Sequence, residues 1–146
     1  MKILYAVNGK ELARVNVKDP SLPATRAGIV PNGTATGNCG ESFFYLYITS
    51  GRGYKIQTGF FLSGGRVAWD IYWATHADEI VNGSTNAGLD TVEPDVPYWG
   101  SSWAMTYYDR VDYWGTHVVG RVTNGKAWIV GGLFCVAGNP NASLWI

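Results

Sequence analysis

The chain has 146 residues, a length usual for one domain and sufficient to bury a hydrophobic core. Eleven Lys and Arg residues balance eleven Asp and Glu residues without any basic run, which argues against a nucleic-acid or anionic-membrane partner. Charged residues make up 15% and aromatic residues 14%, so we expect uncharged polar and aromatic groups on the surface. No apolar run approaches the ~20 residues of a membrane helix.

The first 38 residues are expected to lie apart from the main body. Lys2–Val7 and Lys10–Lys18, joined by Asn8-Gly9, predict a β-hairpin with a two-residue turn. Residues 19–38 are rich in Pro, Gly and Thr without a period, which is typical of an extended connector. We therefore predict one domain over residues 1–146, with a hairpin arm at 1–18, a connector at 19–38 and a body at 39–146.

The body begins with three predicted strands, Ser42–Thr49, Tyr54–Phe61 and Val67–Thr75, which Gly-rich turns join into an antiparallel meander. Alternation places two sets of side chains toward the core: Tyr54, Ile56, Thr58 and Phe60, then Val67, Trp69, Ile71 and Trp73. Phe43–Ile48 is apolar on both faces, which predicts a central strand covered on both sides.

The strand pattern lapses between Thr75 and Ser102. Thr75 and Asp78 before an apolar pair, followed by Asn82-Gly83, predict a short capped helix, and the remainder reads as a long loop. Strands resume at 103–109 and 111–114. A second hairpin is predicted over 116–136, with its turn at Asn124-Gly125.

Eight or nine short strands with Gly-rich turns indicate an all-β fold. We predict an antiparallel β-sandwich, jelly-roll-like, that carries the N-terminal β-hairpin arm; a closed β-barrel is the alternative.

Two cysteines, Cys39 and Cys135, bear on the compartment. They lack the spacing of a zinc site, so we predict a disulfide, with two buried thiols as the alternative. Three Asn-x-Ser/Thr sequons also fit a secreted, extracellular protein. The apolar start of the chain, Met1–Val7, is too short for the core of a signal peptide, so none is expected within this sequence.

The sequence contains few candidates for catalytic residues. The two histidines, His76 and His117, accompany no Gly-x-Ser-x-Gly elbow, which disfavours a nucleophilic hydrolase. The histidines and cysteines do not have the spacing of metal ligands, and we predict neither a metal site nor a cofactor. The acidic run at 90–95 could hold calcium, although a solvated acidic loop is the interpretation we favour.

One short pattern has a counterpart in a known family. Ile56-Gln57-Thr58-Gly59, followed by Trp69-Asp70-Ile71-Tyr72-Trp73, resembles the segment of the glutamic peptidases, a β-sandwich family, that carries their catalytic Gln. The resemblance implies that Gln57 would position water and stabilise an oxyanion. It covers under a fifth of the chain, and the family's catalytic Glu has no counterpart, since Lys126–Val130 lacks an acid. We attribute this likeness to the residue pattern that strands of β-sandwiches share, and not to membership of the family.

The aromatic residues carry the strongest functional signal, because flat rings with a polar handle stack on sugars or on other proteins. We favour a non-catalytic module that binds carbohydrate or a protein surface. A structural subunit of a homo-oligomer, filament or virion is the second hypothesis, and a small hydrolase using Gln57 and an acidic partner is the third. The predicted ligand-binding residues are Tyr98, Trp99, Trp103, Tyr108, Trp114, Gln57, Asp70 and Tyr72.

Overall fold

The computed structural model describes residues 32–37 and 39–146, and the predicted hairpin arm at 1–18 lies outside the described residues. Nine β-strands make up the described chain. Their bounds are β1 Asn32–Gly37, β2 Gly40–Ile48, β3 Gly53–Leu62, β4 Ala68–Val81, β5 Ser84–Gly100, β6 Ser102–Arg110, β7 His117–Ile129, β8 Leu133–Val136 and β9 Asn141–Trp145. No described segment forms a helix of the length and apolarity needed to cross a membrane.

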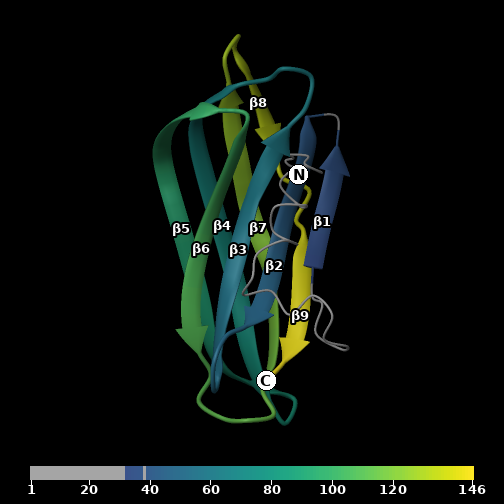
Figure 1. Ribbon diagram of the computed structural model, residues 1–146, viewed down its shortest axis with the longest axis vertical. Coiled ribbons are helices and arrows are strands. Elements are labelled where there is room, and N and C mark those ends of the chain that lie inside the picture. The colour runs from purple at the N-terminus through teal and green to yellow at the C-terminus, as the bar shows by residue number, and fades with distance from the viewer. Residues whose placement is uncertain (1–31, 38) are drawn as a thin grey trace.

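The strands form two antiparallel sheets that pack face to face (Figure 1). One sheet has the order β1-β2-β3-β6, and the other has the order β5-β4-β7. Strands β8 and β9 share the outer edge of β7, where β8 pairs with residues 126–129 and β9 with residues 117–121. The predicted antiparallel sandwich is confirmed, and the sheets do not close into a barrel.

Aromatic rings from both sheets fill the core between them. Trp73 of β4 packs against Phe60 and Trp103 of the facing sheet, with ring centroids 5.7 Å from each. The Trp73 indole Nε1 donates to Thr58 Oγ1 at 2.8 Å, and the Thr58 hydroxyl donates to the Phe43 carbonyl at 2.9 Å. These bonds satisfy polar groups that would otherwise be buried without partners.

Two expectations for burial are confirmed. The β3 face of Tyr54, Ile56, Thr58 and Phe60 is buried in the core. Strand β2 is buried on both faces, because Phe44 and Leu46 join the core while Phe43, Tyr45 and Tyr47 form a second buried cluster.

The predicted helix and long loop between 75 and 102 are wrong, because β4 and β5 run through them as a hairpin. Asn82 and Gly83 form its turn, with φ of 50° and 79°. Inward-facing Thr75, Ala77 and Glu79 keep a period of two. Strand β4 is paired on both edges, so its ladder bonds outweigh the local capping pattern. The meander is also wrong in its third strand, since β4 lies in the other sheet from β3.

The turn predicted at Asn124-Gly125 is wrong as well. Strand β7 continues through it, and the reversal occurs at Gly131 and Gly132, whose φ values are 109° and 96°. Gly125 serves packing, since a Cβ there would lie 2.6 Å from Trp73 Cζ3. At the other end of the chain, residues 32–37, within the predicted connector, form β1.

A disulfide joins Cys39 and Cys135, as predicted. It connects the residue that precedes β2 in one sheet to β8 in the other, 96 positions apart in sequence. A disulfide is compatible with an extracellular location.

Candidate functional site

A β-bulge turns Trp69 outward from the sheet that contains β4. Ala68 pairs with Ile129 of β7, and the next paired position on β4 is Asp70. Ala68 and Ile71 are both fully buried, so the two residues between them point away from the core. Trp69 is consequently 48% exposed, which corrects its predicted place in the core.

Outward-facing aromatic residues lie at about the same level on β5, β7 and β8. Trp99 of β5 lies beside Trp69, because Gly100 pairs with Ala68 and Pro97 with Asp70. Trp128 of β7 pairs with Asp70 on the other side and with Phe134 of β8. We call Trp99, Trp69, Trp128 and Phe134 the aromatic row.

The aromatic row is accessible along its length. Trp99 is 72% exposed and Phe134 is 56% exposed, while Trp128 is half-buried with its ring centroid 6.5 Å from that of Phe134. Neighbouring strands are about 4.8 Å apart, so a row across four strands spans roughly 14 Å. That is an extended apolar surface, much larger than a single exposed side chain.

A cavity of about 320 Å³ opens at the end of the sandwich, above the aromatic row. The β3–β4 turn, the end of β5 and the β7–β8 hairpin form its walls, and in Figure 1 these segments lie at the top. Its lining residues are Gly64, Gly65, Arg66, Val67, Trp99, Ile129, Val130 and Leu133. Trp99 thus belongs to both the cavity and the aromatic row.

Polar side chains lie beside the aromatic row and below it on the same face. Asp70 shares the bulge with Trp69, and Tyr72 pairs with Lys126 of β7. The Tyr72 side chain points outward, because its neighbours Ile71 and Trp73 are buried in the core. Hydrogen-bonding groups therefore border the apolar surface.

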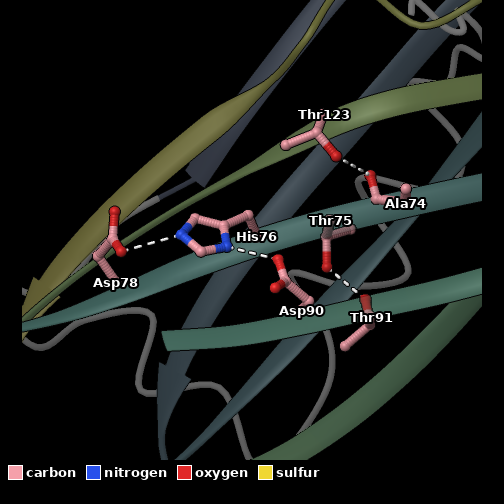
Figure 2. Close-up of polar contacts among 7 residues, drawn as sticks. All are labelled: Ala74, Thr75, His76, Asp78, Asp90, Thr91 and Thr123. Atoms are coloured by element: carbon pink, nitrogen blue, oxygen red, sulfur yellow. Dashed lines mark hydrogen bonds and ion pairs between the residues drawn. The ribbon is translucent and has the colours of Figure 1, made fainter. Parts of the chain in front are cut away.

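His76 lies further along this face and is held between two carboxylates (Figure 2). Its Nδ1 lies 2.6 Å from Asp90 Oδ1 of β5, and its Nε2 lies 2.9 Å from Asp78 Oδ1. Ionised carboxylates only accept hydrogen bonds, so this arrangement suits an imidazolium that donates from both nitrogens. The hydrogen bonds to Asp90 and then Asp78 raise the pKa of His76.

A second titratable cluster lies between the sheets. The hydroxyl of buried Tyr54 donates to Glu79 Oε2 at 3.0 Å and lies 3.4 Å from Asp109 Oδ2. Burial is the main cause that raises the pKa of Glu79, and the charge of Asp109 adds to it. Within the described residues, no group of three or more His, Cys, Asp or Glu side chains is placed to hold a metal ion.

The predicted ligand-binding residues are distributed over the molecule. Trp99, Asp70 and Tyr72 share the face of the aromatic row. Trp103 is buried in the core, and the half-buried Tyr98 donates from its hydroxyl to the Ser102 carbonyl. Trp114 is exposed in the β6–β7 connection, at the other end of the sandwich.

Gln57 and Tyr108 lie on the outer face of the other sheet. The Gln57 amide Nε2 donates to Thr106 Oγ1 at 3.4 Å, across from Tyr45 of β2. The carboxyl pair of Glu79 and Asp109 lies on the inner side of that sheet, where it meets Tyr54. The sheet therefore separates Gln57 from this pair.

Three residues of the aromatic row were not predicted as site residues: Trp69, Trp128 and Phe134. Alternation around Ile129 could have placed Trp128 outward, because Ala127 and Ile129 are apolar and both buried. The bulge that exposes Trp69 leaves no local signal in the sequence.

A comparison of this chain with protein-family models, with curated proteins and with solved structures finds no match.

Proposed function

We propose that this chain is an extracellular, non-catalytic carbohydrate-binding module that holds its ligand against the aromatic row. The observation that carries the proposal is the placement of one outward aromatic residue on each of β5, β4, β7 and β8, at one level of the sheet. Sugar rings present apolar C–H faces that stack on aromatic rings, and the roughly 14 Å span suits a short oligosaccharide.

The surroundings of the aromatic row support a polar ligand. Tyr72 and Lys126 lie directly below it, and both can hydrogen-bond to hydroxyl groups. A small number of placed polar groups beside apolar walls is typical of ligand sites. Rigid strands carry every ring, so little conformational entropy is lost on binding.

Substitution of the exposed rings tests the proposal. Tryptophan fluorescence titration and a glycan array give the affinity of the unmodified chain. Trp99→Ala and Phe134→Ala should each weaken binding by about 1–3 kcal/mol, as expected for the loss of a central aromatic contact.

Trp114→Ala is the matched control, because Trp114 is exposed to a similar extent, 68%, but lies at the opposite end of the sandwich. It should leave affinity unchanged. If no plant, fungal or bacterial glycan bound, or if Trp99→Ala and Trp114→Ala lost affinity equally, the aromatic row would be rejected as a carbohydrate site.

A structural subunit of a homo-oligomer is the second candidate, and the edge strand β8 favours it. Leu133, Phe134 and Val136 are all exposed on this strand, and an apolar edge strand can pair with another chain. Size-exclusion chromatography with light scattering should then show an oligomer that Val136→Lys dissociates. A monomer at every concentration would remove this candidate.

A further inference from the structure

The cavity above the aromatic row contains a single charged lining residue, Arg66. Its other lining residues are two glycines and five apolar residues: Val67, Trp99, Ile129, Val130 and Leu133. None of the lining residues is acidic, so the cavity presents one positive group in largely apolar surroundings. A guanidinium forms charge-assisted hydrogen bonds to an anion, and these are stronger than bonds between neutral groups.

The β3–β4 turn holds the guanidinium in place. Arg66 Nη1 donates to the Ser63 carbonyl at 2.8 Å. A Cβ at Gly64 would lie only 3.0 Å from the same Nη1, so the guanidinium rests against the glycine backbone. A guanidinium carries five N–H donors, more than the bond to Ser63 uses.

We propose that the cavity binds the carboxylate of an acidic saccharide, with Arg66 as the residue that selects it. This inference rests on the proposed carbohydrate-binding function and adds the class of ligand. Arginine matches a carboxylate with two parallel hydrogen bonds, and this geometry distinguishes it from lysine. Because Trp99 lines the cavity and also begins the aromatic row, a uronic-acid residue could place its carboxylate at Arg66 and its ring on Trp99.

The test compares matched ligands on the full chain. Oligosaccharides of glucuronic and of galacturonic acid are titrated beside their carboxyl-reduced counterparts, which keep the ring but lack the charge. The acidic form should bind about tenfold or more tightly, and the difference should shrink as salt is raised. Arg66→Gln should abolish the difference, while Arg66→Lys should restore only part of it.

Arg110→Gln is the control, since Arg110 is exposed at the far end of β6, and it should retain the preference. Melting curves establish that each variant is folded. Equal affinity for acidic and neutral forms, or a preference that survives Arg66→Gln, would overturn the role of Arg66 and leave carbohydrate binding intact. Failure of every saccharide to bind would overturn the proposed function itself, and the two failures are therefore distinguishable.

Discussion

His76 links the acidity of the solution to the stability of the β4–β5 hairpin. Its pKa is raised by hydrogen bonds to Asp90 and Asp78, so the folded chain binds the proton more tightly than the unfolded chain. The stabilisation is therefore complete below the unfolded pKa, about 6.5, and is lost as the pH rises through the raised folded value.

Equilibrium unfolding in urea at pH 5.5 and pH 8.5 measures this linkage. The unmodified chain should lose more free energy of unfolding between the two conditions than His76→Gln. Asp90→Asn, which removes the charge facing Nδ1, should give an intermediate pH dependence. If His76→Gln kept the whole difference, the stabilising role of this cluster would be refuted.

At the scale of elements, the packing of Gly125 explains why β7 runs straight through an Asn-Gly pair. A Cβ at this position would approach Trp73 Cζ3 to 2.6 Å and Ala137 Cβ to 2.8 Å. Gly125→Ala should therefore destabilise the fold by about 1–3 kcal/mol through overpacking, as measured by chemical denaturation. Exposed Asn124→Ala is the control and should change stability by no more than about 0.5 kcal/mol. A cost for Gly125→Ala as small as that of the control would contradict the packing role.

The same residues show which parts of the fold a sequence can predict. Period-two alternation in Tyr54–Phe60 identified a core face correctly, because β3 has no bulge there and its side chains alternate regularly. Asn124-Gly125 has the local signature of a turn, but it lies where Trp73 from β4 needs space. The helix predicted between Thr75 and Gly83 was wrong for a similar reason, since pairing with β5 and β7 decides the conformation of this segment. Long-range contacts of this kind leave no mark in a short window of sequence.

The candidate site was predictable only in part for a related physical reason. Trp99 was singled out because it lies in a cluster of neighbouring aromatic residues, and it is indeed highly exposed. The other members of the aromatic row, Trp69, Trp128 and Phe134, come from three further strands and meet only through register. Trp103, from the same local cluster as Trp99, faces the core instead. Predicting a site that is assembled across strands therefore requires knowledge of the sheet order, which the amino-acid composition does not provide.

At the scale of the whole molecule, the Cys39–Cys135 bridge connects the two walls of the cavity. Cys135 lies in β8, two residues from Leu133 of the cavity wall. The Cys39 carbonyl accepts a hydrogen bond from the Ser63 amide at 2.8 Å, next to Gly64 in the opposite wall. The disulfide thus joins the two sheets at the end that carries the cavity.

Removal of the bridge should therefore weaken the molecule unevenly. The loop closed by the bridge spans 96 residues, so the double variant Cys39→Ala, Cys135→Ala should lose up to about 4–5 kcal/mol of stability on the chain-entropy model. Amide hydrogen exchange should accelerate first at residues 63–66 and 133–136, and later at the β4–β5 turn, which lies at the opposite end. Reduction of the unmodified chain under native conditions should reproduce both effects. Uniform acceleration along the chain would mean that the bridge stabilises the sandwich only globally, whereas faster exchange confined to the cavity end would tie the disulfide directly to the shape of the proposed binding site.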